Sequence, residues 1–273
     1  MSIKAIVTYL YGTLLNGEKR LSEKTVRVLQ ECHKRGILLI PATGRTIEGV
    51  PEFVKELPAV RYLIITNGAK IYDLESHEIL SEYLLDQHTA ARILKYAGSY
   101  HILYDVYIRG RGKSEARFLY HLDEYKIEPE IQKLIRRTRD LVPDIIAHVS
   151  ESQEKIDKIN LYFDDPGLRE RVREHLSRDG EIAVSSSLYN NLEINHRLAD
   201  KGLAVKRLAE FLKIGLEEIM VCGDGNNDLP MMLPEVRKIA VSNASEEVKN
   251  AADYITLSNE ESGVALAIEK FAL

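Results

Sequence analysis

Cysteine is scarce in this chain: Cys32 and Cys222 are its only two cysteines, and they lie far apart in the sequence. Disulfide-dependent scaffolds carry many more, so we expect a reducing, cytoplasmic setting. Long apolar runs are also missing, because no stretch approaches the ~18 residues that span a bilayer. The apolar residues up to Val7 make too short a stretch for a signal peptide. We therefore expect neither a membrane-spanning nor a secretory segment.

A surplus of basic charge is missing as well. Lys and Arg total 37 against 42 Asp and Glu, which gives a net charge of −5. This mild acidity argues against a general nucleic-acid-binding protein. Hydrophobic residues make up 45% and charged residues 29% of the chain, the usual mix for a soluble globular protein. The 273 residues allow one large domain or two modest ones, without internal repeats or low-complexity segments.

Apolar runs alternate with helical patterns in the first eighty residues. The expected strands cover residues 4–10, 37–40 and 62–66. A helix beginning at its N-cap Ser22 and ending near Arg35 separates the first two. A shorter helix around residues 46–57, with Pro51 inside it, separates the second and third. Strands that are apolar throughout and alternate with helices predict a parallel sheet covered on both faces.

The pattern changes after about residue 80 and returns at Gly202. Between them we expect a mixed helix and strand module: helices at 86–97, 128–141 and 168–177, strands at 102–108, 158–163 and 181–185, and a flexible basic turn at 110–113. The segment 158–163 alternates like a half-exposed antiparallel strand. From Gly202 a helix runs to Leu212, followed by a strand at 218–222 and short strands near 240 and 255. We therefore predict an α/β fold with a discontinuous core, residues 1–82 and 188–273, and an inserted α+β domain, residues 83–187.

The strongest local signal is the acidic loop Gly223-Asp224-Gly225-Asn226-Asn227-Asp228, which directly follows an apolar strand. Two carboxylates four residues apart on a tight turn can converge on a hard cation such as Mg²⁺, which prefers oxygen ligands. The alternative is a Gly/Asn-rich loop that binds nothing.

Other polar residues follow strands of the same predicted sheet. The hydroxyl of Thr43 and the N–H groups around Gly44 can hold a phosphate oxygen, although a simple turn is the alternative. Lys201 can neutralise a phosphate, although most lone lysines are solvated. In parallel sheets ligands bind outside the carboxyl edge of the strands. Thr43, Asn67 and the acidic loop are all expected there, which predicts a phosphate and Mg²⁺ site.

Motifs in a specific order and spacing extend over nearly the whole chain. They are Tyr9–Leu15, Ala42–Arg45, Thr66–Ala69, Asn191–Ile194, Lys201-Gly202, Gly223–Asp228, Met232-Leu233, Ser242–Ala244 and Asn259–Ala265. With these motifs the chain resembles the haloacid dehalogenase-like (HAD) hydrolases, in particular the Cof-type (subfamily IIB) sugar phosphatases. The resemblance implies a Rossmann-like core with an inserted α/β cap that selects the substrate. It also implies Mg²⁺-dependent hydrolysis of small phosphorylated metabolites, with neither nucleic acid nor membrane as a partner.

The resemblance also implies roles for single residues. Thr43, Gly44 and Lys201 match positions that hold the phosphoryl group, and Asn67 matches a position near it. Asp224 matches a Mg²⁺ ligand, with Asp228 and Asn227 as supporting residues. The backbone carbonyl of Tyr11 matches a further metal ligand. In the expected cap, Arg111 and Lys113 are candidates for substrate contact.

The first motif departs from the family pattern in one decisive way. The family reads Asp-x-Asp-Gly-Thr-Leu, whereas this chain reads Tyr9-Leu10-Tyr11-Gly12-Thr13-Leu14. In the family the first Asp attacks phosphorus and the second is the general acid and base. A phenol has a pKa of ~10 and is mostly protonated at neutral pH, so it needs activation that a carboxylate does not. Tyr9 also removes a negative metal ligand, which should weaken Mg²⁺ binding.

Three interpretations follow from this departure. The chain is a phosphatase scaffold with abolished or very weak activity, a non-catalytic pseudo-enzyme that binds a phosphorylated metabolite or partner, or an enzyme with unusual tyrosine chemistry. In the first two, Tyr9 and Tyr11 simply pack as aromatic residues at a strand end. The first interpretation accounts best for an acidic loop that is intact beside a first motif without carboxylates.

Overall fold

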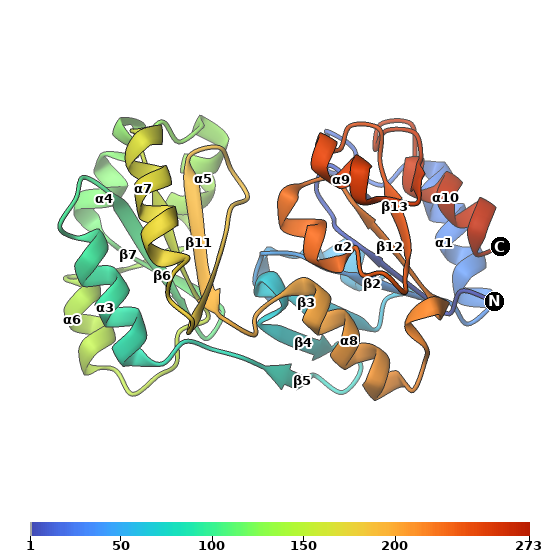
Figure 1. The fold of residues 1–273 in the computed structure, drawn as a ribbon, viewed down its shortest axis with the longest axis horizontal. Coiled ribbons are helices and arrows are strands. Elements are labelled where there is room, and N and C mark those ends of the chain that lie inside the picture. Colours follow the sequence, from blue (N-terminus) through green and yellow to red (C-terminus); the bar gives the residue numbers. More distant parts are fainter. Residues whose placement is uncertain (1) are drawn as a thin grey trace. The chain divides into compact units, whose positions relative to one another are not determined.

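A computed structural model describes residues 2–273, and its internal contacts divide the chain into two compact units (Figure 1). The core unit comprises Met1–Glu82 and Asp200–Leu273, and the inserted unit comprises Tyr83–Ala199. The expected return to the core at residue 188 is too early. Residues Asn191–His196 form β11, which pairs with two strands of the inserted unit. None of the helices formed by residues 2–273 has both the length and the apolar character needed to cross a bilayer.

The core unit is built on a five-stranded parallel sheet with the order β14-β13-β12-β1-β2. Its strands are β1 (Ala5–Thr8), β2 (Leu38–Pro41), β12 (Ile219–Gly223), β13 (Arg237–Ala240) and β14 (Tyr254–Ile255). The central strand β1 pairs in parallel with β12 and with β2, so that Ala5 lies beside both Ile219 and Leu38. The predicted α/β fold with a Rossmann-like parallel core is confirmed.

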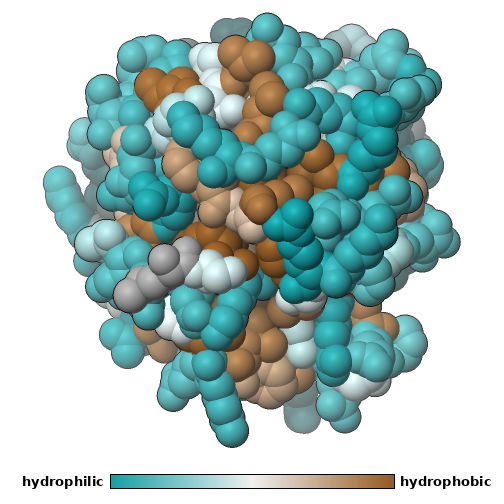
Figure 2. All heavy atoms as spheres, turned by 90° about the vertical axis from the view of Figure 1, so that its right-hand side faces the viewer, coloured by the Kyte–Doolittle hydropathy of each residue, from teal (hydrophilic) through white to brown (hydrophobic). Residues whose placement is uncertain are grey.

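Helices cover the two faces of this sheet. They are α1 (Glu23–Lys34), α2 (Glu52–Lys55), α8 (Lys201–Leu212), α9 (Glu246–Ala251) and α10 (Gly263–Phe271). Because side chains alternate along a strand, Ile6 packs in one cluster with α1 and α10, while Ala5 and Val7 pack in another with α8. The prediction that Ser22 caps α1 is confirmed, since its hydroxyl accepts a hydrogen bond from the Thr25 N–H at 3.0 Å. Viewed from the side of α1 and α10, hydrophobic atoms lie in strips between hydrophilic side chains (Figure 2).

Two expectations for the first segment are wrong in detail. The single helix at 46–57 is instead a short 3₁₀ turn, η1 (Ile47–Gly49), followed by α2, with Pro51 at the N-cap of α2. A proline disfavours helical geometry in the residue before it, and Val50 is extended. The third strand, β3 (Tyr62–Ile65), belongs to a small antiparallel sheet with β4 (Lys70–Asp73) and β5 (Glu78–Glu82). Isolated parallel bridges, Leu39 with Val60 and Ala42 with Ile64, still join the segment that contains β3 to β2 and the residue after it.

The inserted unit has its own six-stranded sheet, in the order β10-β11-β9-β6-β7-β8. Its strands besides β11 are β6 (Leu103–Ile108), β7 (Arg111–Glu115), β8 (Arg139–Val142), β9 (Lys158–Tyr162) and β10 (Ile182–Ser185). Its helices are α3 (Gln87–Ala97), α4 (Ala116–Tyr120), α5 (Pro129–Thr138), α6 (Ile145–Glu151) and α7 (Pro166–Leu176). One hydrophobic cluster joins these helices to the sheet.

Three local expectations for this unit are wrong. The basic segment 110–113 is a turn only at its start, because Arg111–Glu115 forms β7 against β6. The helix expected to reach residue 141 ends at Thr138, and the chain continues as the edge strand β8. The strand β9 pairs antiparallel with β6 and β11 as expected, but it is buried along its whole length rather than half-exposed.

Candidate active site

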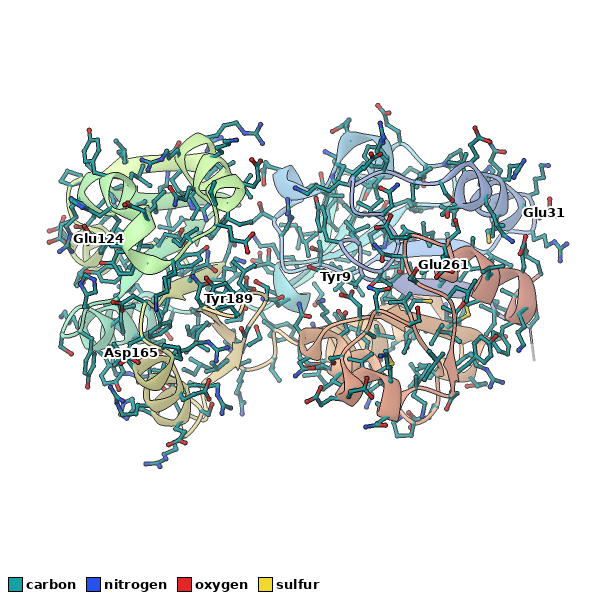
Figure 3. All side chains as sticks on the ribbon, turned by 90° about the horizontal axis from the view of Figure 1, so that it is seen from above. Tyr9, Glu31, Glu124, Asp165, Tyr189 and Glu261 are labelled. Carbon is teal, nitrogen blue, oxygen red and sulfur yellow. The ribbon has the colours of Figure 1, made fainter. Side chains whose placement is uncertain are left out.

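The candidate residues of the core unit follow the ends of its strands. Tyr9 follows β1, Thr43 lies just beyond β2, and Asp224 follows β12. Since these strands are parallel, the three residues emerge at the same edge of the sheet. In Figure 3 Tyr9 lies at the end of the core unit opposite Glu31 of α1.

A buried ion pair joins Lys201 to Asp228. Lys201 is the first residue of α8, whose N-cap Asp200 accepts a hydrogen bond from the Leu203 N–H at 2.8 Å. The Lys201 Nζ lies 2.6 Å from Asp228 Oδ1, and their side chains are 1% and 0% exposed. The other oxygen, Asp228 Oδ2, accepts from the N–H groups of Asp224 and Gly225 at 3.1 and 3.2 Å. Asp228 therefore fixes both the lysine and the acidic loop.

Asp224 lies beside the turn that follows β1. The Thr13 hydroxyl donates a hydrogen bond to Asp224 Oδ1. Gly12 has a φ of +83°, and a Cβ built on it would lie 2.8 Å from Asp224 Oδ2, so the approach depends on glycine. Burial raises the pKa of Asp224 to about 6; Thr13 opposes the rise and Asp228 adds to it. The carboxyl is thus poorly hydrated and lies beside a second negative charge.

Thr43 and Asn67 meet in adjoining loops. The Asn67 N–H donates to the Thr43 carbonyl at 3.0 Å, and Thr43 Oγ1 accepts from the Arg45 N–H at 3.2 Å, across Gly44. Asn67 has a φ of +58° within the 3₁₀ turn η2 (Thr66–Gly68). A Cβ on Gly68 would lie 2.4 Å from the Asp200 carbonyl oxygen, so this turn packs directly on the start of α8. The loops bring Thr43 and Asn67 to the Lys201 end of α8.

Each tyrosine of the first motif presents its ring to a cation. The Lys201 Nζ lies 4.3 Å from the centroid of the Tyr9 ring. The guanidinium carbon of Arg45 lies 3.9 Å from the centroid of the Tyr11 ring, whose hydroxyl donates to the Gly49 carbonyl at 3.3 Å. The two rings meet edge to face, with centroids 6.5 Å apart. These are cation–π contacts, and they are strongest where the cation is desolvated.

The environment of Tyr11 does not activate its phenol. Burial raises the pKa of Tyr11 above its ordinary value of 10, and the charge of Arg45 opposes that rise only in part. A phenol with a raised pKa remains protonated at neutral pH and is a poor nucleophile. The role of Arg45 was not predicted, although it lies in the Ala42–Arg45 motif. Its contact with Tyr11 depends on how the two loops fold together.

Two further contacts that the sequence did not predict hold this edge together. The Asn243 side-chain amide donates to the Gly12 carbonyl at 2.8 Å. The Ser245 N–H donates to the Asp224 carbonyl at 2.9 Å. Asn227 lies between the two aspartates on η5 (Asn226–Met231) and is partly exposed. The loop after β13 thus supports the turn after β1 and the acidic loop.

The remaining donor set fits Mg²⁺ poorly. Both oxygens of Asp228 are engaged by Lys201 and by backbone N–H groups. Of the two aspartates predicted for the metal, this leaves Asp224, which already accepts the Thr13 hydroxyl. Residues 2–273 bring no three side chains of His, Cys, Asp or Glu together in a way that could hold a metal ion. Mg²⁺ usually needs more oxygen ligands than one carboxylate supplies.

Arg111 and Lys113 lie on β7 of the inserted unit, where both contact Asp140. The Arg111 Nη2 lies 2.6 Å from Asp140 Oδ1 and the Lys113 Nζ lies 2.9 Å from Asp140 Oδ2. Hydrogen bonds from these two cations hold the pKa of Asp140 well below its ordinary range. Their role in substrate contact stays a prediction. A substrate that bound them would have to replace Asp140 as the partner of each side chain.

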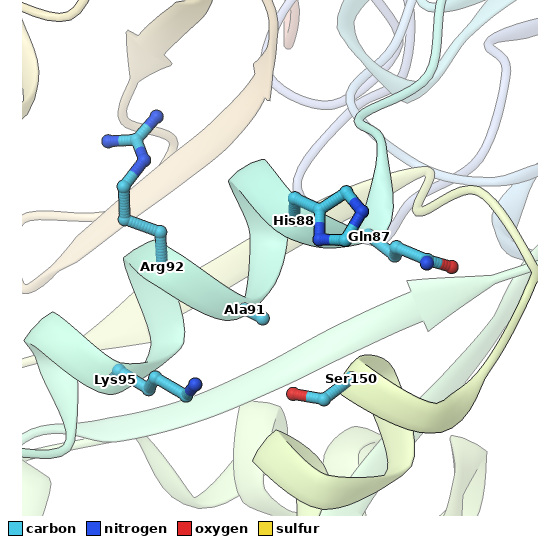
Figure 4. Close-up of a pocket in the computed structure, with 6 residues that line it drawn as sticks. All are labelled: Gln87, His88, Ala91, Arg92, Lys95 and Ser150. Atoms are coloured by element: carbon cyan, nitrogen blue, oxygen red, sulfur yellow. The ribbon is translucent and has the colours of Figure 1, made fainter.

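A pocket of about 350 Å³ lies in the inserted unit and contains none of the predicted site residues. It is lined by Gln87, His88, Ala91, Arg92 and Lys95 of α3 and by Ser150 of α6 (Figure 4). Arg92 is already paired with Asp179 at 2.7 Å. The chemistry expected of this protein therefore does not belong to this pocket.

A family model for haloacid dehalogenase-like hydrolases matches residues 6–268. The chain belongs to this family. It is 28% identical, over 100% of its length and 97% of the relative, to the 5-amino-6-(5-phospho-D-ribitylamino)uracil phosphatase YcsE of Bacillus subtilis. A solved haloacid dehalogenase-like hydrolase from B. subtilis is 27% identical and superimposes with a TM-score of 0.85, covering 99% of this chain and 100% of the other.

The fold extends to more distant members of the family. The HAD subclass IIB sugar phosphatase BT4131 is 19% identical, with a TM-score of 0.81 over 98% of both chains. At this identity the likeness shows the fold alone. The family resemblance predicted from the motifs is confirmed, and the chain has the scaffold of a HAD phosphatase.

Proposed function

We propose that this chain is a HAD phosphatase scaffold for small phosphorylated metabolites, sugar phosphates among them, whose hydrolytic activity is abolished or strongly impaired. The observation that carries the proposal is the chemistry of positions 9 and 11. Aromatic rings stand there where the family has carboxylates, and their faces contact Lys201 and Arg45. The rest of the polar network around Asp224 and Asp228 remains connected.

Each role assigned by the family pattern needs a carboxylate at these positions. The residue at position 9 attacks phosphorus, and a phenol, whose ordinary pKa is ~10, has little of the nucleophilicity of a carboxylate at neutral pH. The residue at position 11 transfers a proton at neutral pH, and burial moves the pKa of Tyr11 further from that range. Loss of a catalytic nucleophile commonly lowers kcat by several orders of magnitude.

The residues that would hold a phosphoryl group are still present. Lys201 would supply positive charge, and Thr43 with the N–H groups around Gly44 would supply hydrogen bonds. Mg²⁺, where bound, would supply Lewis-acid stabilisation of the phosphoryl oxygens. A carboxylate at position 9 would add a second acidic ligand beside Asp224, which supports the expectation that Mg²⁺ binds weakly to the present chain.

The test is p-nitrophenyl phosphate hydrolysis, with and without Mg²⁺, by the parent chain and by Tyr9→Asp/Tyr11→Asp. The parent is expected at background and the double variant is expected to turn over only with Mg²⁺. Tyr9→Asn/Tyr11→Asn is the matched control, because it removes both rings without supplying a carboxylate and should stay inactive. Comparable Mg²⁺-dependent activity in the parent would contradict the proposal.

A second candidate function is a non-catalytic protein that binds a phosphorylated metabolite or partner. The intact set Lys201, Thr43 and Asn67 favours it, since these residues match phosphate-contacting positions. It would gain support if Tyr9→Asp/Tyr11→Asp stayed inert while the parent bound a sugar phosphate in a calorimetric titration.

A further inference from the structure

We propose that the Tyr9 ring excludes phosphate from Lys201, so that this chain lacks affinity for phosphate groups as well as catalytic carboxylates. The inference rests on the proposed function, which makes Lys201 the cation that holds the phosphoryl group. It goes further because it assigns Tyr9 a second effect that is independent of its poor nucleophilicity.

The first argument is the space around the Lys201 ammonium. Its Nζ lies 2.6 Å from Asp228 Oδ1 and 4.3 Å from the Tyr9 ring centroid, and its side chain is 1% exposed. A phosphate oxygen bound to an ammonium must approach to about 2.8 Å. With the side chain enclosed, a phosphate oxygen can approach only by displacing a group that surrounds the ammonium, and the Asp228 carboxylate and the Tyr9 ring are two such groups.

The second argument is which of these two partners can leave. Asp228 is completely buried and also accepts two backbone N–H groups, so its removal would break a connected network. The Tyr9 backbone is fixed by its N–H, which donates to the Cys222 carbonyl at 3.1 Å. The ring can therefore leave only by rotation of its side chain, which would give up the desolvated cation–π contact. Phosphate must compete with that contact.

The third argument is the second cation. Arg45 lies over the Tyr11 ring at 3.9 Å, and the Tyr11 hydroxyl is held by the Gly49 carbonyl. Lys201 and Arg45 thus each have an aromatic face as a neighbour. The arrangement argues against the second candidate function, which requires the parent to bind a phosphate group at this site.

The experiment measures the binding of inorganic phosphate by calorimetric titration, without metal. Tyr9→Ala removes the ring and supplies no carboxylate, so it is expected to bind at least about tenfold more tightly than the parent. Tyr9→Phe keeps the ring face and is expected to behave as the parent does. Adding Lys201→Gln to Tyr9→Ala should abolish the gain. Circular dichroism checks that each variant is folded, and Tyr9→Ser replaces Tyr9→Ala if that variant does not fold.

Equal affinity in the parent and in the variant without the ring would overturn the inference, whether both bind phosphate or neither does. A gain that survives Lys201→Gln would overturn it too, because the anion would then bind elsewhere. The proposed function is judged separately, by turnover in Tyr9→Asp/Tyr11→Asp. If Tyr9→Asp/Tyr11→Asp is active and the parent binds phosphate, only the inference is rejected. If Tyr9→Ala gains affinity for phosphate and Tyr9→Asp/Tyr11→Asp is inactive, only the proposed function is rejected.

Discussion

Single residues at the strand edge show how two substitutions change the chemistry of a site and leave its scaffold in place. Tyr9 and Tyr11 stand where the family pattern has carboxylates, yet the Lys201–Asp228 pair and the Thr13–Asp224 contact are formed. The faces of the two rings also contact the cations Lys201 and Arg45. The side chains at positions 9 and 11 therefore determine the reactivity of the site, whereas the contacts around them stabilise its structure.

Gly202 offers a stability test next to Lys201. A Cβ at position 202 would lie 2.0 Å from the Pro230 carbonyl oxygen, so α8 and η5 would have to separate. Gly202→Ala is expected to lower the free energy of unfolding by about 1–3 kcal/mol. Urea denaturation measures the change.

The matched control for that change is Gly180→Ala, because a Cβ there meets nothing within 4 Å and its φ is not positive. It should leave the stability unchanged or raise it by at most about 1 kcal/mol. Equal losses in both variants would show that the contact with Pro230 is not the cause.

His196 gives the inserted unit a pH-dependent stability. Burial lowers the pKa of His196, and Arg197 and Lys155 lower it further, against the raising effect of Asp86 and Glu181. Because the folded pKa lies below that of an unfolded histidine, ~6.5, the unfolded chain takes up the proton first as the pH falls. The stabilising contribution is therefore present above pH ~6.5 and is lost as the pH falls through the folded pKa.

The measurement is the urea midpoint at pH values of about 7.5 and 5.5. His196 Nδ1 accepts from the Leu198 N–H at 3.1 Å, and an asparagine oxygen can replace that acceptor without titrating. His196→Asn is expected to lose less stability on acidification than the parent. His33→Asn, at an exposed position of α1, is the control and should lose as much as the parent. An unchanged pH dependence in His196→Asn would contradict the prediction.

Among the elements, helix starts were predicted better than helix ends. Ser22 caps α1 as predicted, and Asp86, expected only as the start of a helix, caps α3; each side-chain oxygen accepts an N–H of the first turn. Such local contacts can be predicted from a few neighbouring residues. The end of α5 at Thr138 was missed, because the next residues leave the helix to pair with β7.

The cap of α3 can be tested directly. Asp86 Oδ1 accepts from the N–H groups of His88 and Thr89 at 2.9 and 3.0 Å. Asp86→Ala is expected to cost about 1 kcal/mol of unfolding free energy, measured by urea denaturation. Glu128 at the N-cap of α5 makes no side-chain capping hydrogen bond. Glu128→Ala should therefore change stability by less than about 0.5 kcal/mol; a similar cost in both would contradict the assignment.

At the scale of the whole molecule, the inserted unit has the features of an independent domain. Its hydrophobic cluster consists of residues between Leu85 and Ile194, all within the unit, and its six strands pair among themselves. The core unit, in contrast, needs both chain segments, because β1 lies between β12 and β2. The parallel sheet of the core unit can therefore form only when residues 1–82 and 200–273 pack together.

This difference predicts how fragments fold. Residues 83–199 expressed alone are expected to show one cooperative thermal transition by circular dichroism, since a domain with its own core can fold by itself. Residues 1–82 alone should show none, because they lack β12, β13 and β14. A non-cooperative 83–199 fragment would mean that the inserted unit depends on the core for its stability.

The sequence by itself determined the family, the alternation of strands and helices, the cap of α1, and the loss of both first-motif carboxylates. These features depend on local pattern and residue identity. Only the tertiary structure decided that the core resumes at Asp200, that β9 is wholly buried, and that Lys201 and Arg45 lie against Tyr9 and Tyr11. Each of these depends on pairing or packing between residues that are distant along the chain, and no local pattern records such contacts.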